Sequence, residues 1–138
     1  MALSKNRKVE LIKRIPLFAR CTRKELEAVA AEADELDVRE GKELTRQGER
    51  GREVIVLVEG TADVRRNGRR VNRLGAGDFL GEISVISGVP RTATVTTTSD
   101  ARLLVLTDRA FKRVVDGMPS VQANVLRSVA ERLLADTL

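Results

Sequence analysis

Apolar residues recur at helical spacing near both ends of the chain and at strand spacing in the middle. The first segment ends at Pro16 and has one apolar face, made of Leu3, Leu11, Ile12 and Ile15. A second segment opens on the capping box Thr22-Arg-Lys-Glu25, in which the Thr22 hydroxyl accepts a backbone N–H and Glu25 reaches back. Its inner face consists of Leu26, Val29, Ala30 and Ala33. We therefore expect a helical flank over residues 1–34.

The C-terminal part of the chain also follows a helical period. Asp108 is suited to cap a helix over residues 109–115, Gly117 to stop it at the C′ position, and Pro119 to begin the next helix. The last segment carries one apolar stripe, Val121, Val125, Val129 and Leu133, with Leu126, Ala130 and Leu134 beside it. Helices are therefore expected over residues 108–138.

The centre of the chain alternates short apolar runs with turn residues. Nine of the ten glycines fall between Gly41 and Gly88, where turns are needed. Residues 53–58 consist of Glu53 and an apolar, mostly β-branched run over 54–58, as in a strand that is covered on both faces. Asn67-Gly68 is a strong signal for a type I′ hairpin between neighbouring strands. The strands expected on this basis are 53–58, 61–66, 69–74, 92–98 and 102–106, which together favour a β-sandwich or barrel.

Composition limits the chemistry that the chain can support. With 138 residues and 42% apolar residues, one globular domain is expected. The chain has no histidine and one cysteine, Cys21, so His-dependent catalysis, His- or thiolate-bound metals and an internal disulfide are not expected. A net charge of +5 favours an anionic partner. We expect a binding protein rather than an enzyme, with no metal and no resident cofactor.

The same composition bears on location. The longest apolar runs are too short to span a bilayer, and the N-terminus lacks the apolar stretch of a signal peptide. A cytoplasmic protein without a transmembrane segment is the expectation. Cys21 is read as a small, half-buried residue at the start of a helix.

Residues 77–95 carry the most informative chemistry. Glu82 and Arg91 lie nine positions apart around a short apolar turn. A carboxylate and a guanidinium at this separation can hold a small ligand that has a hydroxyl at one end and a phosphate at the other. The alternative is an ordinary ion pair that caps a helix and binds nothing.

The chain resembles the cyclic nucleotide-binding domain family from about residue 15 to residue 115. The resemblance is carried in order by Gly41, Gln47-Gly48-Glu49, Glu59-Gly60, Gly77-Asp78, Gly81-Glu82 and Pro90-Arg91-Thr92-Ala93. It implies a mainly β fold with flanking α-helices, namely a β jelly roll (double-stranded β-helix) with N-terminal helices and C-terminal lid helices. The implied single domain, 1–138, has a helical flank over 1–34, a β-roll over 35–107 with a phosphate-binding cassette at 81–95, and C-terminal helices over 108–138.

The resemblance also implies a role for each site residue. Arg91 would pair with the cyclic phosphate, assisted by backbone N–H groups near Ser84 and by Thr92. Glu82 would accept the ribose 2′-hydroxyl, and Gly81 would let the backbone approach the sugar. The chain lacks Tyr and Trp, so the base would be capped by Arg127, Arg132 or an aliphatic residue such as Leu126. Of the remaining candidates, Leu74 and Phe79 could be pocket wall or core, and Ile83 could be a ligand contact or core. Ala93 is a ligand-binding candidate as part of the motif.

The favoured function is a sensor or regulatory domain that binds cyclic AMP, with cyclic GMP as the other ligand considered. The implied partners are an effector protein or fused effector domain and a second copy that pairs through the C-terminal helix. A ligand-free interaction module of the same fold is the alternative. A jelly-roll enzyme of the cupin type is excluded because it would need histidine ligands.

Basic residues gather at two places, the Asn67-Gly68 turn (Arg65, Arg66, Arg69 and Arg70) and the first helical segment. A solvated surface is the favoured reading of both, and an anionic partner is the alternative. Direct DNA binding is not expected, since the sequence ends at Leu138 without a helix-turn-helix.

Overall fold

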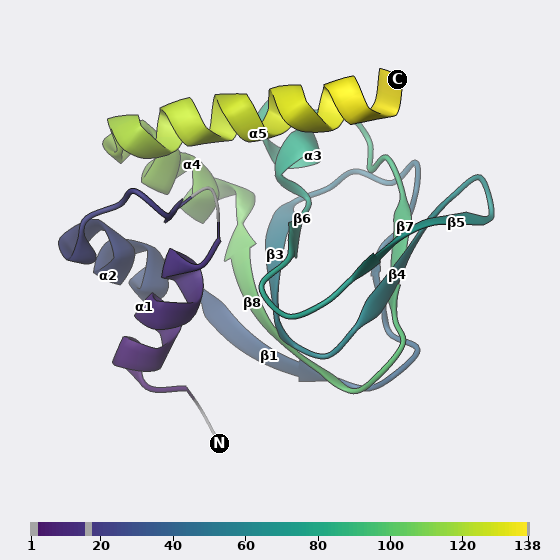
Figure 1. Ribbon diagram of the computed structural model, residues 1–138, viewed down its shortest axis with the longest axis horizontal. Helices are drawn as coiled ribbons and strands as arrows, with labels where there is room; N and C mark the ends of the chain where they lie inside the picture. Colours follow the sequence, from purple (N-terminus) through teal and green to yellow (C-terminus); the bar gives the residue numbers. More distant parts are fainter. Residues whose placement is uncertain (1–2, 16–17, 138) are drawn as a thin grey trace. The chain divides into compact units, whose positions relative to one another are not determined.

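The computed structural model describes residues 3–15 and 18–137 (Figure 1). Its contacts divide the chain into two compact units. Asp34–Asp108 forms a β unit, and the helices on either side of it in the sequence form a helical unit. The expected single domain over 1–138 stays a prediction.

The β unit contains two four-stranded sheets in which every pair of neighbouring strands is antiparallel. The first has the order β1-β8-β3-β6, with the bounds Asp34–Val38, Ala101–Thr107, Glu53–Glu59 and Phe79–Leu80. The second has the order β2-β7-β4-β5, with the bounds Glu43–Thr45, Thr94–Thr97, Ala62–Arg66 and Arg69–Leu74. The order is non-sequential in both sheets, as in a jelly roll.

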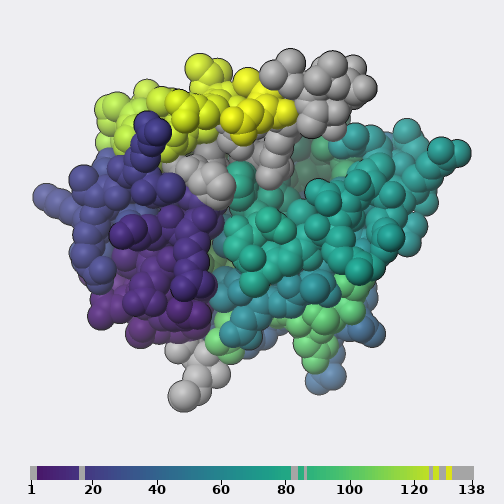
Figure 2. Space-filling view, viewed as in Figure 1, coloured from purple at the N-terminus to yellow at the C-terminus, as the bar shows by residue number. Residues whose placement is uncertain are grey.

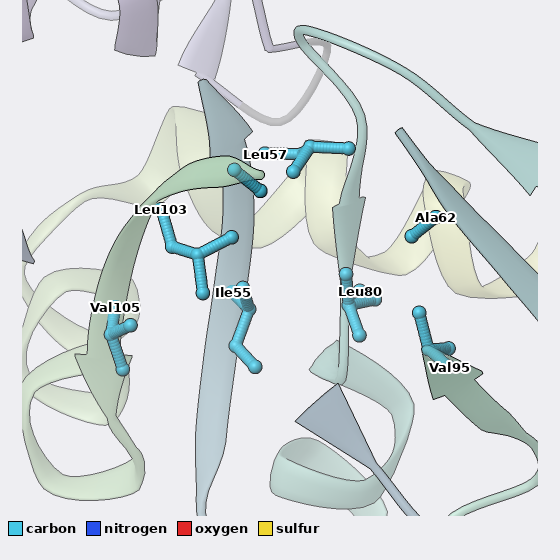
Figure 3. Close-up of a cluster of buried hydrophobic side chains, with 8 residues drawn as sticks. Ile55, Leu57, Ala62, Leu80, Val95, Leu103 and Val105 are labelled. Atoms are coloured by element: carbon cyan, nitrogen blue, oxygen red, sulfur yellow. The ribbon is translucent and has the colours of Figure 1, made fainter. Parts of the chain in front are cut away.

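The core of the β unit lies between the two sheets. Side chains from β3, β6 and β8 point toward side chains from β4 and β7 (Figure 3). β3 is buried at its five central positions, which confirms the strand covered on both faces that its apolar run predicted. The cluster consists of Ile55, Leu57, Ala62, Leu80, Val95, Ala101, Leu103 and Val105.

The β4–β5 hairpin turns at Asn67-Gly68, as predicted. Both residues have positive φ, 53° and 80°, as a type I′ turn requires. The Gln47 side chain holds this turn, because its Nε2 donates to Asn67 Oδ1 and its Oε1 accepts from the Asn67 N–H, both at 2.8 Å. In Figure 2 the hairpin, in teal, projects from the β unit.

The helical unit contains α1 (Lys5–Lys13), α2 (Arg23–Glu32), α4 (Asp108–Gly117) and α5 (Pro119–Thr137). The capping box of α2 is confirmed. The Thr22 hydroxyl accepts the Glu25 N–H at 3.2 Å, and Glu25 Oε1 accepts the Thr22 N–H at 2.8 Å. Cys21, just before this cap, is buried, more so than expected. Burial raises the pKa of its thiol, and the nearby Glu25 carboxylate raises it further.

α1 is shorter than its apolar pattern suggested. Ser4 caps its N-terminus by accepting the Arg7 N–H at 3.1 Å, so Leu3 lies before the helix and Ile15 after it. Val9, which the expected face omitted, is buried together with Leu11 and Ile12. Pro16, which was expected to end the segment, lies outside the described residues.

α4 ends at Gly117, but the predicted placement of this glycine at the C′ position, past the end of the helix, is wrong. Gly117 is the last residue of the helix and does not take a positive φ. Two residues later Pro119 begins α5, as predicted. Gln122 Nε2 donates to the carbonyl oxygens of Val115 at 2.9 Å and Asp116 at 3.4 Å. A side chain of α5 therefore satisfies the exposed end of α4, so a left-handed glycine is not needed. Asp108, expected as the cap, is already the first residue of α4.

Candidate functional site

Arg91 lies between α3 (Glu82–Ser87) and β7, and its main chain is tied to the loop that follows β2. Its carbonyl oxygen accepts the Gly48 N–H at 2.9 Å, and its own N–H donates to the Glu49 carbonyl oxygen at 2.8 Å. This pair of bonds resembles a short two-strand ladder. It fixes the backbone of Arg91 against a loop more than forty residues earlier in the sequence.

The Arg91 guanidinium is held inside the β unit. The residue is 8% exposed. Nη1 donates to the Gly81 carbonyl oxygen at 3.1 Å, and Nη2 donates to the Glu53 carbonyl oxygen at 2.8 Å. Two main-chain acceptors on different segments thus orient the plane of the guanidinium. Burying this cation is costly without compensation, and the carbonyl dipoles supply part of it.

Gly81 connects this guanidinium to α3. It has a φ of 97°, a left-handed value that favours glycine, and it is the N-cap of the helix. Its carbonyl oxygen accepts the Val85 N–H at 3.2 Å as well as the bond from Arg91. The first turn of α3 and the guanidinium therefore share one acceptor. Ser84, in this turn, is buried.

The structure brings several other candidates into the β unit. Thr92 is exposed, and its carbonyl oxygen accepts a 3.1 Å bond from Arg66 Nε. Ala93 is buried, and its carbonyl oxygen accepts from Thr45 Oγ1 at 3.0 Å. Phe79 is buried in β6, and Leu74 packs against the core cluster. Leu74 therefore contacts the core, which is one of the two roles that the sequence left open for it.

Some candidates are placed only by their backbone or lie in the other unit. Glu82 and Ile83 are the first two residues of α3, and their side chains lie outside the description. Arg127 and Arg132 belong to α5 in the helical unit. Arg127 is exposed, whereas the side chain of Arg132 is also not described. The roles of these four residues stay predictions.

Sequence reasoning missed the main-chain acceptor at Glu53 and the contribution of the loop after β2. Gln47, Gly48 and Glu49 entered the family pattern without a role. In the structure Gln47 also donates its N–H to Thr94 Oγ1 at 2.9 Å, which joins the loop to β7. Every residue has a carbonyl oxygen, so the pattern of side chains cannot show which one acts as an acceptor. Only the ordered family motif could have pointed to the loop after β2.

Arg46, in the charged loop beside Arg91, is paired with two carboxylates. Arg46 lies 2.6 Å from Glu43 and 3.6 Å from Glu49, and these carboxylates raise the pKa of its guanidinium.

Within the described residues, no group of three or more His, Cys, Asp or Glu side chains could hold a metal ion. Across that same part of the chain, none of the helices combines the length and hydropathy needed to cross a membrane.

Comparisons with known proteins agree with this geometry. The family model for the cyclic nucleotide-binding domain matches residues 35–117. A cAMP-dependent protein kinase regulatory subunit from Mycosarcoma maydis is 37% identical over 119 residues, which are 78% of this chain and 22% of that protein. A cyclic nucleotide-gated potassium channel from Rhizobium etli is 31% identical over 123 residues, 89% of this chain and 34% of the channel.

A solved structure shows the same fold. The regulatory domain of Toxoplasma gondii protein kinase A with cAMP superposes with a TM-score of 0.81 at 26% identity, covering 92% of this chain and 50% of that one. The expected jelly roll with flanking helices is thus confirmed. This chain spans only about a fifth to a third of the curated relatives it matches. From the family model, these relatives and the fold, the chain belongs to the cyclic nucleotide-binding domain family.

Proposed function

We propose that this chain is a sensor domain that binds cyclic AMP, with cyclic GMP as the second ligand to be tested. The observation that carries the proposal is the buried Arg91 guanidinium, which two carbonyl oxygens orient beside the start of α3. A planar guanidinium can give two parallel charge-assisted bonds to a phosphate. Because its orientation is set by the protein, less freedom is lost when the phosphate arrives.

The remaining contacts follow the family pattern. Backbone N–H groups near Ser84 and at Thr92 would add donors to the phosphate, and Glu82 would accept the ribose 2′-hydroxyl. Gly81 would let the backbone approach the sugar. On α5, Leu126 and Arg127 are neighbours and both exposed, Leu126 at 74%, so either could cover a base. Arg132 is the third candidate for this cap.

Cyclic AMP is favoured over cyclic GMP for two reasons. The kinase regulatory subunit that resembles this chain is named for cAMP, and the solved Toxoplasma gondii domain contains it. Thr92, directly after Arg91, is the feature that keeps cyclic GMP open, because a hydroxyl at this position can reach a guanine. Its main chain is already held by Arg66.

The signal would be a population shift. Capture of phosphate by Arg91 would draw α3 inward, and the helices from Asp108 onward would close over the base. The ligand can drive this only if it binds the closed state more tightly. The output would pass to an effector protein or fused effector domain in the cytoplasm, or to a second copy through α5. Val121 of the α5 stripe is already buried, so pairing would use residues further along the helix.

Calorimetric titration with cyclic AMP, cyclic GMP and linear 5′-AMP tests the proposal. We expect saturable binding of a cyclic nucleotide and much weaker binding of 5′-AMP, whose phosphate is dianionic and not ring-closed. Failure of both cyclic nucleotides to bind the folded chain would refute the sensor function and favour the ligand-free interaction module. Hydrogen exchange of α5 with and without ligand, together with size-exclusion chromatography, would test the helix movement and the dimer separately.

A further inference from the structure

Gly51, which precedes Arg52 and β3, lies directly against the Arg91 side chain. A Cβ built on Gly51 would lie 2.5 Å from Cζ and 2.8 Å from Cδ of Arg91, and would also collide with Nε. Real Cβ atoms essentially never come within 3.0 Å of such neighbours. Any side chain at position 51 would therefore require Arg91 to move.

The backbone conformation of Gly51 does not itself call for glycine. Its φ lies outside the left-handed range, so alanine could adopt it. Gly81 differs, because it combines a φ of 97° with a Cβ position that would meet both Arg91 and, at 2.5 Å, the Glu53 carbonyl oxygen. The reason for glycine at position 51 that the structure shows is therefore clearance for Arg91.

The local backbone cannot easily relieve such a collision. The main chain of Arg91 is bonded in both directions to Gly48 and Glu49, three and two residues before Gly51. The atoms that the new Cβ would meet belong to the far end of a flexible side chain. The guanidinium is therefore the part that yields, and in moving it would leave the carbonyl oxygens of Gly81 and Glu53.

We propose that Gly51 is a positioning residue. Gly51 and Gly81 form a slot, in which Gly51 lies against Cδ and Nε of Arg91 and Gly81 lies against Nη1. This slot sets where Arg91 presents its charge. The effect on nucleotide affinity rests on the proposed function, whereas the effect on the Arg91 side chain does not. Substitution at Gly51 keeps the full charge of the site but misplaces it. Any effect of the substitution on nucleotide affinity should therefore depend on the presence of Arg91.

The test uses Gly51→Ala, Arg91→Ala and the double variant. Gly75→Ala is the matched control, because Gly75 belongs to the same unit, lacks a left-handed φ and has nothing within 4 Å of its Cβ position. Three quantities are measured on each protein. They are the Nε–Hε NMR signal of Arg91, assigned by its loss in Arg91→Ala, the free energy of unfolding in urea, and the affinity for cyclic AMP.

We expect Gly51→Ala to shift the Arg91 signal and to weaken cyclic AMP binding by about tenfold or more, the scale of losing a hydrogen bond to a charged group. Gly75→Ala should change neither quantity. In the Arg91→Ala background, Gly51→Ala should have no further effect on affinity. It should also change the free energy of unfolding less there than it does when Arg91 is present. An unshifted Arg91 signal with wild-type affinity, or equal effects in both backgrounds, would overturn the proposal.

Two other outcomes also decide the question. If Gly51→Ala does not fold but the double variant does, the collision with Arg91 is supported, and if neither folds, the slot is refuted. If no variant, including the wild type, binds a cyclic nucleotide, the sensor function fails. In that case the role of Gly51 is still decided by the Arg91 NMR signal and by whether the effect of Gly51→Ala on the free energy of unfolding depends on the presence of Arg91.

Discussion

Arg91 and Glu53 lie 38 positions apart in the sequence, yet Nη2 of Arg91 donates a 2.8 Å hydrogen bond to the carbonyl oxygen of Glu53. Glu53 is the first residue of β3, a strand with five buried central positions. The guanidinium is thus anchored at the start of a largely buried strand of the β unit, and α3 is joined to the same group through Gly81. Any movement of Arg91 toward a ligand would therefore disturb its hydrogen bonds to β3 and to the N-cap of α3.

Replacing Arg91 with alanine should weaken cyclic nucleotide binding by about 2–5 kcal/mol, because a buried phosphate would lose its charged partner. Arg69→Ala removes the same charge from an exposed position at the hairpin and should leave affinity nearly unchanged. Calorimetric titration measures both. Equal affinity of wild type and Arg91→Ala would rule out Arg91 as the phosphate ligand.

Replacing Glu82 with alanine should cost about 1–3 kcal/mol of binding free energy, the scale of one hydrogen bond to a charged group. If the lost partner is the ribose 2′-hydroxyl, the wild type should prefer cyclic AMP over its 2′-deoxy form. The variant should bind the two ligands equally. A variant that keeps the wild-type preference would show that another group recognises the ribose.

Thr22→Ala should lower the free energy of unfolding by about 1 kcal/mol, because it leaves the Glu25 N–H without its capping oxygen. Thr22→Ser retains a hydroxyl and should stay close to the wild type. Urea denaturation followed by circular dichroism compares the three proteins. A serine variant as unstable as the alanine variant would mean that the methyl group, not the cap, matters.

Leu103 and Leu36 face each other as partners across the β1–β8 ladder, but Leu103 is 1% exposed and Leu36 is 49% exposed. Leu103→Ala should therefore destabilise the protein by about 2–5 kcal/mol, since it leaves a cavity between the sheets. Leu36→Ala removes the same atoms at the sheet edge and should cost far less. Similar losses in chemical denaturation would contradict the position assigned to the core.

Asp37 accepts a 2.9 Å bond from Arg102 Nε, and this bond lowers the pKa of the Asp37 carboxyl below its ordinary value. A lowered pKa in the folded state means that the stabilisation is fully present above about pH 4, the ordinary aspartate range, and is lost as the pH falls through the lower folded pKa. The difference in unfolding free energy between wild type and Asp37→Asn should therefore shrink in acid.

The exposed carboxylate of Glu40 provides the control for this pH dependence. Glu40→Gln removes one exposed carboxylate from the same unit and so measures the effect of the change in net charge alone. Denaturant unfolding between pH 3 and pH 7 makes the comparison. A difference for Asp37→Asn that does not change with pH would show that the ion pair with Arg102 does not persist in solution.

Local rules in the sequence were enough for the elements whose signals are short-range. The capping box at Thr22, the Asn67-Gly68 turn and the buried run of β3 were each predicted from neighbouring residues and are each observed. β1, β2 and β6 were not predicted. β1 has the sequence DELDV, with three carboxylates and little alternation, and β2 and β6 have three and two residues. Their pairing with distant strands, not their own propensity, makes them strands.

Gly117 shows the same limit at a helix end. The sequence indicates a glycine stop, but Gln122, five residues later, supplies the donors that the last carbonyls of α4 need. Which group satisfies a helix terminus depends on how the next helix is oriented. That orientation is a property of packing, so the local pattern could not give it.

The order of motifs in the sequence determined the family, the jelly roll and the choice of Arg91 and Gly81 as site residues. Only the tertiary structure decided how Arg91 is held, because its acceptors are main-chain carbonyl oxygens on Gly81 and Glu53 and its clearance depends on Gly51. Carbonyl groups are common to all residues, and the space that a missing side chain leaves is visible only once distant segments have packed together.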